Sequence, residues 1–185
     1  HQPVKVAAME AHWRSEPPGH GVPLVVFAVP NEREERNDYE LAMPRLGSLI
    51  LTHARDGDIQ PLTSVPRDER PPVKPVFYAF RVMVGLGMAM LLLTLASLWA
   101  WKRKTLFESR WLLDGWRLLA PSGFIALVAG WYVVEIGRQP YVVYGLLRTS
   151  EAVSPNIVAA AVLSSLVVYA AAYAFVFGAG IWYLQ

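Results

Sequence analysis

The clearest chemical feature of this chain is a glutamate and an arginine, three residues apart, at the end of a long uncharged stretch. Residues 118–134 contain no Asp, Glu, Lys or Arg, and Glu135 and Arg138 follow at once. Ionisable groups at such a depth are costly and usually functional. Trp131, Glu135 and Arg138 lie at i, i+4 and i+7, so a helix would place them on one face. Glu135 could ligate a haem or another metal, relay protons, or only pair with Arg138.

Two residues of an earlier apolar run have chemistry of their own. Met83 is of a type that usually fills a core, but a thioether can also ligate haem iron and raise its potential. Arg81, at the mouth of the same run, could extend to the surface or bind a carboxylate such as a haem propionate. Lys5 and Glu10 are five residues apart and share a helix face poorly, so by themselves they are typical of solvated charges.

The composition excludes several kinds of site. The chain has no cysteine, which excludes disulfides, thiolate metal sites, iron–sulfur clusters and covalent c-type haem attachment. The four histidines lack metal-ligand spacing, and Asp56-Gly57-Asp58 is too short for a calcium loop. A net charge of +2 lacks the strong excess of basic residues that is typical of nucleic-acid-binding proteins, so we expect no nucleic-acid partner. A hydrophobic share of 54% with few charges indicates a membrane protein.

Three apolar stretches are long enough to cross a bilayer and to position these residues. The 20 uncharged residues from Val82 to Trp101 would span about 30 Å as a helix, the thickness of the hydrocarbon core. The second stretch is 118–134, and the third lies within 152–185, with Asn156 as the expected helix start. We predict transmembrane helices at about 76–101, 115–136 and 156–183. The many small residues of the third helix indicate packing inside a larger bundle.

The basic residues predict how these helices are oriented. Five of them cluster in or beside the short connection between the first two helices: Lys102, Arg103, Lys104, Arg110 and Arg117. The positive-inside rule places that connection in the cytoplasm and residues 1–75 on the outer side. Residues 1–75 are rich in proline and charge, so we predict an extramembrane region. Within it we expect a short helix over 5–13, a strand or interfacial stretch over 23–30 and a membrane-surface element over 47–53.

Three motifs follow one another along the chain. The first is His1-Gln2-Pro3-Val4-Lys5-Val6-Ala7-Ala8-Met9-Glu10, the second is Phe80-Arg81-Val82-Met83, and the third runs from Gly130-Trp131 through Glu135-Ile136-Gly137-Arg138-Gln139-Pro140. In this order they resemble subunit I of cytochrome bd-type quinol oxidases, and most closely the cyanide-insensitive branch with a short quinol loop. The resemblance covers essentially all 185 residues as the C-terminal part of a longer subunit, in keeping with a chain that opens at His1 without Met.

The resemblance implies a fold and an activity. The fold would be an all-α membrane protein with three transmembrane helices of a larger helical bundle, preceded by an extramembrane quinol-binding loop at 1–75. The activity would couple oxidation of a membrane quinol to reduction of dioxygen to water in the bacterial cytoplasmic (inner) membrane. Two b haems, and a d haem or a third b-type haem, are the implied cofactors. Implied partners are the quinol, dioxygen, the N-terminal half of the subunit, a second oxidase subunit and the lipid bilayer.

The resemblance also implies roles for individual residues. Lys5 and Glu10 match loop residues that take part in quinol binding and oxidation. Met83 matches the axial ligand of the low-spin haem b, and Arg81 the basic residue beside it. The third motif matches the high-spin haem pair, with Glu135 as its carboxylate ligand and with Trp131 and Arg138 as neighbours.

Two further expectations follow. The axial histidines of the family come from earlier helices, so we expect this segment by itself to be catalytically inactive. The alternative function is a non-redox membrane scaffold or transporter fragment. That alternative accounts for the spans and for a Glu135–Arg138 pair, but gives no reason for Lys5, Glu10 and Met83 to fall in register with the third motif.

Overall fold

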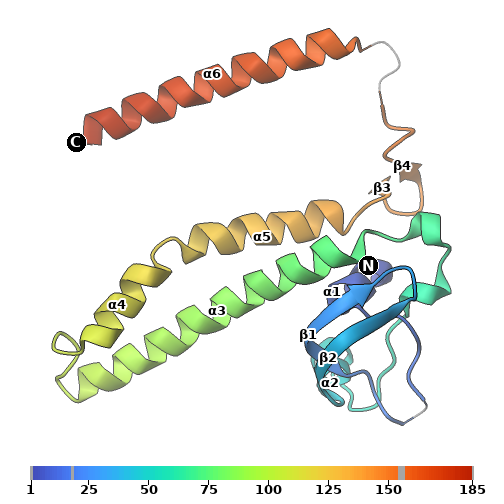
Figure 1. The fold of residues 1–185 in the computed structure, drawn as a ribbon, viewed down its shortest axis with the longest axis horizontal. Coiled ribbons are helices and arrows are strands. Elements are labelled where there is room, and N and C mark those ends of the chain that lie inside the picture. Colours follow the sequence, from blue (N-terminus) through green and yellow to red (C-terminus); the bar gives the residue numbers. More distant parts are fainter. Residues whose placement is uncertain (1, 18, 154–156, 185) are drawn as a thin grey trace. The chain divides into compact units, whose positions relative to one another are not determined.

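The chain forms two compact units, residues 1–149 and 150–185, and each is described by itself (Figure 1). The computed structural model describes residues 2–17, 19–153 and 157–184. The second unit contains one long helix, α6 (Ala159–Leu184), of 26 residues. Its side chains are exposed along the whole described helix. The expected start of this helix at Asn156 lies outside the described residues.

The prediction of a helical protein with three membrane-spanning segments is confirmed. The first segment is α3 (Val73–Lys102), the second combines α4 (Arg110–Leu119) with α5 (Ser122–Ile136), and the third is α6. All three are long and apolar enough to cross a membrane. The 30 residues of α3 extend over about 45 Å, which is more than the hydrocarbon core of a bilayer requires. Part of α3 therefore reaches beyond the membrane.

The second segment is not one continuous helix. The helix expected over 115–136 begins earlier, at Arg110, and is interrupted at Ala120 and Pro121. Proline has no amide hydrogen to donate, and its ring clashes with the carbonyl four residues earlier, so Pro121 ends α4 and starts α5. As a result the second segment consists of α4, which adjoins the predicted cytoplasmic connection, and α5.

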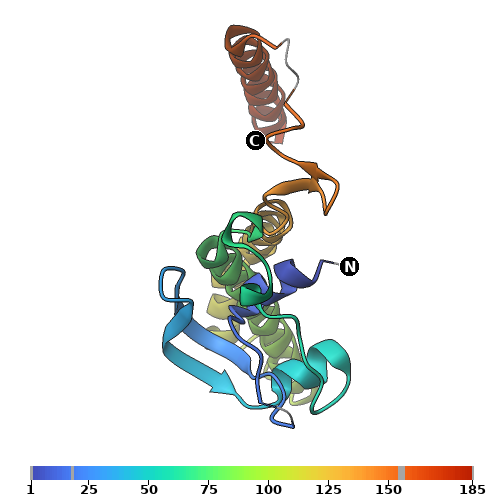
Figure 2. The ribbon, with the colours of Figure 1, turned by 90° about the vertical axis from the view of Figure 1, so that its right-hand side faces the viewer.

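The part of unit 1 that precedes α3 forms a small cap that packs on the first turns of α3 (Figures 1 and 2). Its elements are α1 (Pro3–Glu10), β1 (Leu24–Asn31), β2 (Arg36–Met43), α2 (Leu46–Thr52) and two 3-10 turns, Leu62–Ser64 and Arg67–Glu69. Strands β1 and β2 form an antiparallel hairpin in which Leu24 pairs with Met43 and Asn31 with Arg36. The short helix and the first strand match the sequence prediction, whereas β2 was not predicted.

The first turns of α3 contribute to the core of the cap. Val76 and Phe77 are fully buried in the cap core together with residues of α1. Arg81 therefore lies two turns inside α3, and the expectation that it marks the mouth of the helix is wrong. The hairpin tip caps this helix end, because the Glu32 carboxylate accepts hydrogen bonds from the amides of Val73 and Lys74, both at 3.1 Å. Amides at a helix N-terminus lack partners within the helix, so an acidic side chain stabilises them.

A second, smaller hairpin follows α5. Strands β3 (Tyr141–Val143) and β4 (Leu147–Arg148) pair antiparallel. Arg148 then contacts Asp68 at 3.1 Å and Glu69 at 3.4 Å, in the turn that precedes α3. The segments at the outer ends of α3 and α5 are thus joined to each other, which fixes the region that carries the third motif.

Candidate functional site

The three sequence motifs meet at the cap end of α3 and α5. The first motif lies on α1, the second within α3 and the third at the end of α5. Helix α1 packs against α3, and α3 packs along α5. Each pair of motifs is joined by a specific contact between side chains or between a side chain and a glycine. The structure therefore brings together residues that are more than a hundred positions apart in the chain.

Glu10 joins the first motif to the second through a buried ion pair. It is the last residue of α1 and only 4% exposed. The Arg81 guanidinium donates to its carboxylate at 2.8 Å, and the same guanidinium lies over the Phe77 ring, 4.5 Å from the ring centre. Burial raises the pKa of Glu10 above its ordinary value, although the positive charge of Arg81 opposes that shift. The expectation that Glu10 is a solvated charge is wrong.

Met83 joins the second motif to the third. A Cβ atom added to Gly130 would lie 3.0 Å from the Met83 sulfur, so the thioether packs directly against the bare backbone of α5. Met83 is half-buried there. A side chain at position 130 would crowd the sulfur, and glycine avoids this. The Met83 sulfur thus contacts Gly130, which is the first residue of the third motif and precedes Trp131.

Lys5 joins the first motif to the third. A Cβ atom added to Gly137 would lie 2.9 Å from both Cγ and Cδ of Lys5, so the aliphatic part of this lysine packs on the end of α5. Lys5 and Glu10 thus point to different helices, Lys5 toward α5 and Glu10 toward α3. This explains how two residues that share a helix face poorly can both belong to one site.

The third motif spans the end of α5 and the turn after it. Trp131 is 63% exposed and, with Glu135, lines a small pocket of about 100 Å³. Helix α5 ends at Ile136, so Arg138 lies in the following turn and not on the helix. It nevertheless folds back and forms an ion pair with Glu135. The structure therefore contains the Glu135–Arg138 ion pair, which was one of the roles considered for Glu135. The ion pair does not exclude the other two roles, as a metal ligand or a proton relay.

Two arginines of this region have spare donor groups. The Nε atoms of Arg81 and Arg138 are buried and have no hydrogen-bond partner in the described part of the chain. Buried donors of this kind are normally satisfied, so each is suited to an additional acceptor such as a carboxylate. Haem carries two propionate carboxylates, and the residues present therefore fit a haem group. The described residues contain no cluster of three or more His, Cys, Asp or Glu that could hold another metal ion.

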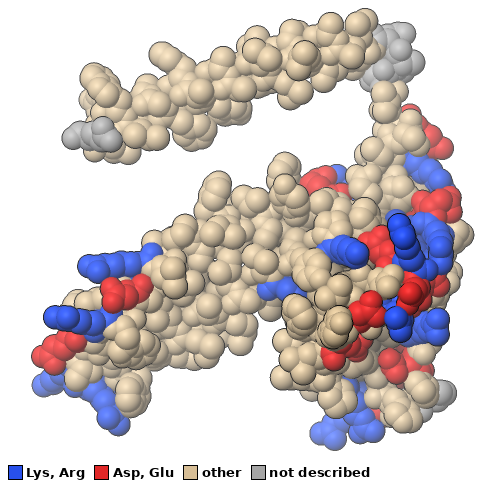
Figure 3. All heavy atoms as spheres, viewed as in Figure 1, with Lys and Arg blue, Asp and Glu red and all other residues tan. Residues whose placement is uncertain are grey.

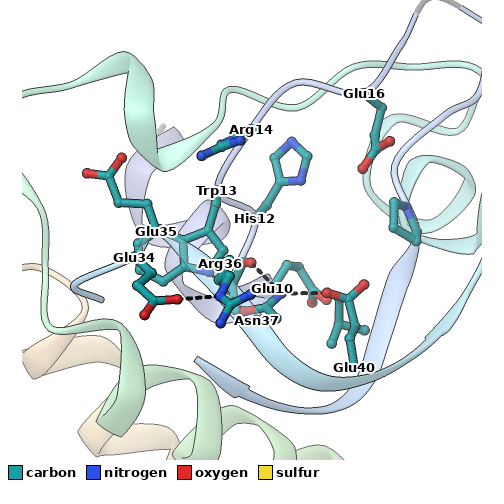
Figure 4. Close-up of a pocket in the computed structure, with 13 residues that line it drawn as sticks. Glu10, His12, Trp13, Arg14, Glu16, Glu34, Glu35, Arg36, Asn37 and Glu40 are labelled. Carbon is teal, nitrogen blue, oxygen red and sulfur yellow. Dashed lines mark hydrogen bonds and ion pairs between the residues drawn. The ribbon is translucent and has the colours of Figure 1, made fainter. Parts of the chain in front are cut away.

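A pocket of about 320 Å³ in the cap is lined by Glu10 (Figure 4). Asn37 organises its wall, because it accepts a hydrogen bond from the Trp13 indole at 2.8 Å and donates to Glu40 at 2.8 Å. His12 lines the same pocket and is 6% exposed. Sequence reasoning missed this wall, since nothing in the spacing of these residues connects β2 to the turn after α1. It also missed the glycine contacts of Gly130 and Gly137.

His12 makes the stability of the cap depend on pH. Burial lowers the pKa of His12 below its ordinary value of 6.5, although Glu16, Asp58 and Glu40 oppose that shift. As the pH falls below about 6.5, His12 binds a proton in the unfolded chain but remains neutral in the folded cap. The free energy of unfolding therefore decreases until the pH reaches the pKa of His12 in the folded cap. We expect limited proteolysis of residues 14–22 in the full-length protein to accelerate from about pH 7 to pH 5. His12→Gln should remove this dependence, whereas His53→Gln, at an exposed position, should retain it.

The fold and the site together define a class of protein. It is a helical membrane protein with a cap at one end of α3 and α5. A buried ion pair and two glycine contacts join the three motifs there. The helices α3 and α5 carry a methionine and a glutamate that are candidate metal ligands. The family model for cytochrome bd terminal oxidase subunit I matches residues 1–185, the entire chain. The chain belongs to this family, as the three motifs predicted. Membership implies haem cofactors.

Individual relatives agree with the family. The chain is 35% identical to cytochrome bd ubiquinol oxidase subunit 1 of Bacillus subtilis, over 93% of this chain and 38% of the relative. It is 28% identical to cytochrome bd-II ubiquinol oxidase subunit 1 of Escherichia coli, over 82% of this chain and 42% of the relative. The solved structure of bd oxidase from Geobacillus thermodenitrificans superimposes with a TM-score of 0.73 at 30% identity, over 97% of this chain and 40% of that one. The chain thus spans about two fifths of the length of these relatives.

Proposed function

We propose that this chain is the C-terminal part of a terminal quinol oxidase, which couples oxidation of a membrane quinol to reduction of dioxygen to water. One observation carries the proposal beyond family membership. The Glu10–Arg81 pair, with 2.8 Å between the charged groups, joins the motif that we assign to quinol binding to the helix that carries Met83, and this contact supports the proposal. A scaffold or transporter fragment has no need for such a connection.

We assign the roles of the site residues as follows. Lys5 binds the quinol through its ammonium group, and Glu10 binds the quinol and takes up its protons. Met83 would hold the iron of a low-spin haem b through its sulfur, and Arg81 would pair with a propionate of that haem as well as with Glu10. Glu135 would supply a carboxylate ligand to the high-spin haems, flanked by Trp131 and Arg138. When bound, the haems accept electrons one at a time and deliver them to dioxygen.

The environment of Glu10 suits a general base for quinol oxidation. A base works best when its pKa lies near the operating pH, and burial moves the pKa of Glu10 upward from the usual carboxylate range. The proton that Glu10 accepts can then leave through the pocket that Glu10 lines (Figure 4). The positive-inside rule puts this pocket on the periplasmic side, so quinol protons would be released there. Charge separation then follows from the sidedness of the reaction.

The assembled oxidase requires more than these residues. Bacterial relatives and apolar helices indicate the inner membrane. We propose that the remaining haem ligands come from helices in the N-terminal half of the subunit, and that a second oxidase subunit completes the complex. The proposed set of cofactors is two b haems with a d haem or a third b-type haem. A red-shifted band in the reduced spectrum would identify the d haem.

Lys5 offers a test that separates quinol binding from haem binding. Lys5→Leu keeps carbon atoms at the Cγ and Cδ positions that pack on Gly137, and it removes the ammonium group together with Cε. In the full-length protein we expect quinol-driven oxygen consumption to fall by about tenfold or more, as when a hydrogen-bonding partner of a substrate is lost, with the haem spectrum unchanged. Lys74→Leu, at an exposed position of the same cap, is the matched control and should be neutral. Equal rates for wild type and Lys5→Leu would remove Lys5 from the quinol site.

A further inference from the structure

In unit 1, the end of α3 opposite the cap carries a concentrated group of charged residues. Between residues 102 and 117 there are five basic residues (Lys102, Arg103, Lys104, Arg110, Arg117) and two acidic ones (Glu108, Asp114). Figure 3 shows these side chains gathered where α3 turns into α4, next to the uncharged surface of α3 and α5. The group is thus net positive and adjoins the apolar spans directly.

Helix α4 holds part of this group in a fixed orientation. Leu112 is fully buried against Leu93 and Ala100 of α3. On the same helix, the Trp116 indole donates a hydrogen bond to the Ser97 hydroxyl at 2.9 Å. These contacts attach one face of α4 to the end of α3. The opposite face, which carries Arg110, Asp114 and Arg117, is therefore presented outward on a rigid element.

The outward face of α4 forms a groove between two arginines. Arg110, Leu113, Asp114 and Arg117 line a groove of about 380 Å³. The two arginines are seven residues apart, which is two turns or about 10 Å along the helix axis. Asp114 pairs with Arg117 at 3.2 Å, but the side chains are 68% and 81% exposed, so this pair is easily exchanged for another anion. Guanidinium groups suit phosphate oxygens because they donate two parallel hydrogen bonds.

Tryptophans around the groove place it at the depth of lipid headgroups. Trp99, Trp101, Trp111 and Trp116 are between 43% and 65% exposed, and all lie at this end of the spans. Arg103 lies over the Trp99 ring, 4.1 Å from its centre. Exposed tryptophans concentrate at the boundary between hydrocarbon and headgroups, and basic residues follow them on the cytoplasmic side. The groove therefore faces the layer in which lipid phosphates lie.

We propose that the outward face of α4, with the basic turn before it, binds the phosphate headgroup of an anionic phospholipid. The positive-inside rule requires positive charge in this connection, but it does not require two arginines on one face of a helix that is packed down on its other face. Each basic residue near an anionic lipid surface contributes about fivefold to binding. This inference is independent of the proposed redox function, because it uses none of the residues of the candidate quinol and haem sites.

The test uses the purified full-length complex in nanodiscs. One set contains phosphatidylcholine alone, and the other contains phosphatidylcholine with phosphatidylglycerol. The measurements are the thermal unfolding midpoint and the number of acidic lipids retained per complex by native mass spectrometry. The test variant is Arg110→Gln/Arg117→Gln. The control is Arg33→Gln/Arg55→Gln, which removes two exposed arginines from the cap.

We expect phosphatidylglycerol to raise the unfolding midpoint of the wild type and of the control variant. The test variant should retain at least about fivefold less acidic lipid than the wild type, and it should lose most of this stabilisation. Excess inorganic phosphate in phosphatidylcholine discs should not reproduce the effect. The inference is overturned if phosphatidylglycerol stabilises the test variant as much as wild type, or stabilises neither. It is also overturned if inorganic phosphate alone gives the full effect, since the occupant would then be a soluble anion.

Discussion

Replacing Met83 by leucine in the full-length protein is expected to abolish the low-spin b band of the reduced-minus-oxidised spectrum. Leucine and methionine have similar volumes, and such exchanges usually cost less than about 1.5 kcal/mol of stability, so the protein should still assemble. What leucine lacks is the sulfur donor. Because the proposed transfer of electrons from quinol to dioxygen needs the haems, oxygen consumption driven by quinol should fall by at least about tenfold when this haem is lost.

Met88 provides the control for this experiment. It lies on the same helix, five residues further along, and is 51% exposed. Met88→Leu makes the identical chemical change away from Gly130 and the third motif, and should leave spectrum and activity intact. A Met83→Leu protein with a normal low-spin b band would show that the thioether is core filler.

Replacing Glu10 by glutamine is expected to lower the rate of quinol oxidation by about 100-fold or more, the usual loss when a general base is removed. Glutamine keeps an oxygen that can accept the hydrogen bond from Arg81, so the haem content should be retained. Glu10→Ala should be worse, because it leaves Arg81 buried without its partner, and breaking a buried pair in this way costs about 3–5 kcal/mol. Glu34→Gln, an exposed carboxylate on the rim of the same pocket, is the matched control.

The pH profile adds a second measurement on Glu10. The base must be ionised to accept a proton, so the wild-type rate should fall as the pH drops through the folded pKa of Glu10, which lies above 4.5. The contribution of Glu10 to the free energy of unfolding changes with pH in the opposite direction to the rate. Because its folded pKa is raised, that contribution is present below about pH 4.5 and is lost as the pH rises through the folded value. An unchanged rate and profile in Glu10→Gln would exclude Glu10 as the base.

The sequence predicts the membrane spans well because uncharged runs of this length have few alternative structures. The residues at which the helices begin and end are less predictable. Residues 73–80 contain two ionisable or polar positions and a proline, and only their burial against α1 makes them the first turns of α3. Strand β2 was missed because its sequence is mostly polar, and a hairpin pairs through its backbone whatever the side chains are.

The candidate site was predictable as a set of residues but not as an arrangement. Glu135 and Arg138 are neighbours in sequence, so their pairing follows from local geometry. The contact between Glu10 and Arg81 joins residues 71 positions apart, and it depends on how α1 packs on α3. The closeness of Met83 to Gly130 likewise depends on the packing of α3 on α5. Local sequence patterns carry no information about such contacts.

The most direct test of the account is a spectrum of membranes that contain the full-length protein, reduced with quinol and then exposed to oxygen. The account predicts haem b bands that appear on addition of quinol and disappear when oxygen is admitted, with water as the product. A protein that is well expressed and folded, yet shows no haem bands, would contradict the proposed function and favour a membrane scaffold without redox chemistry.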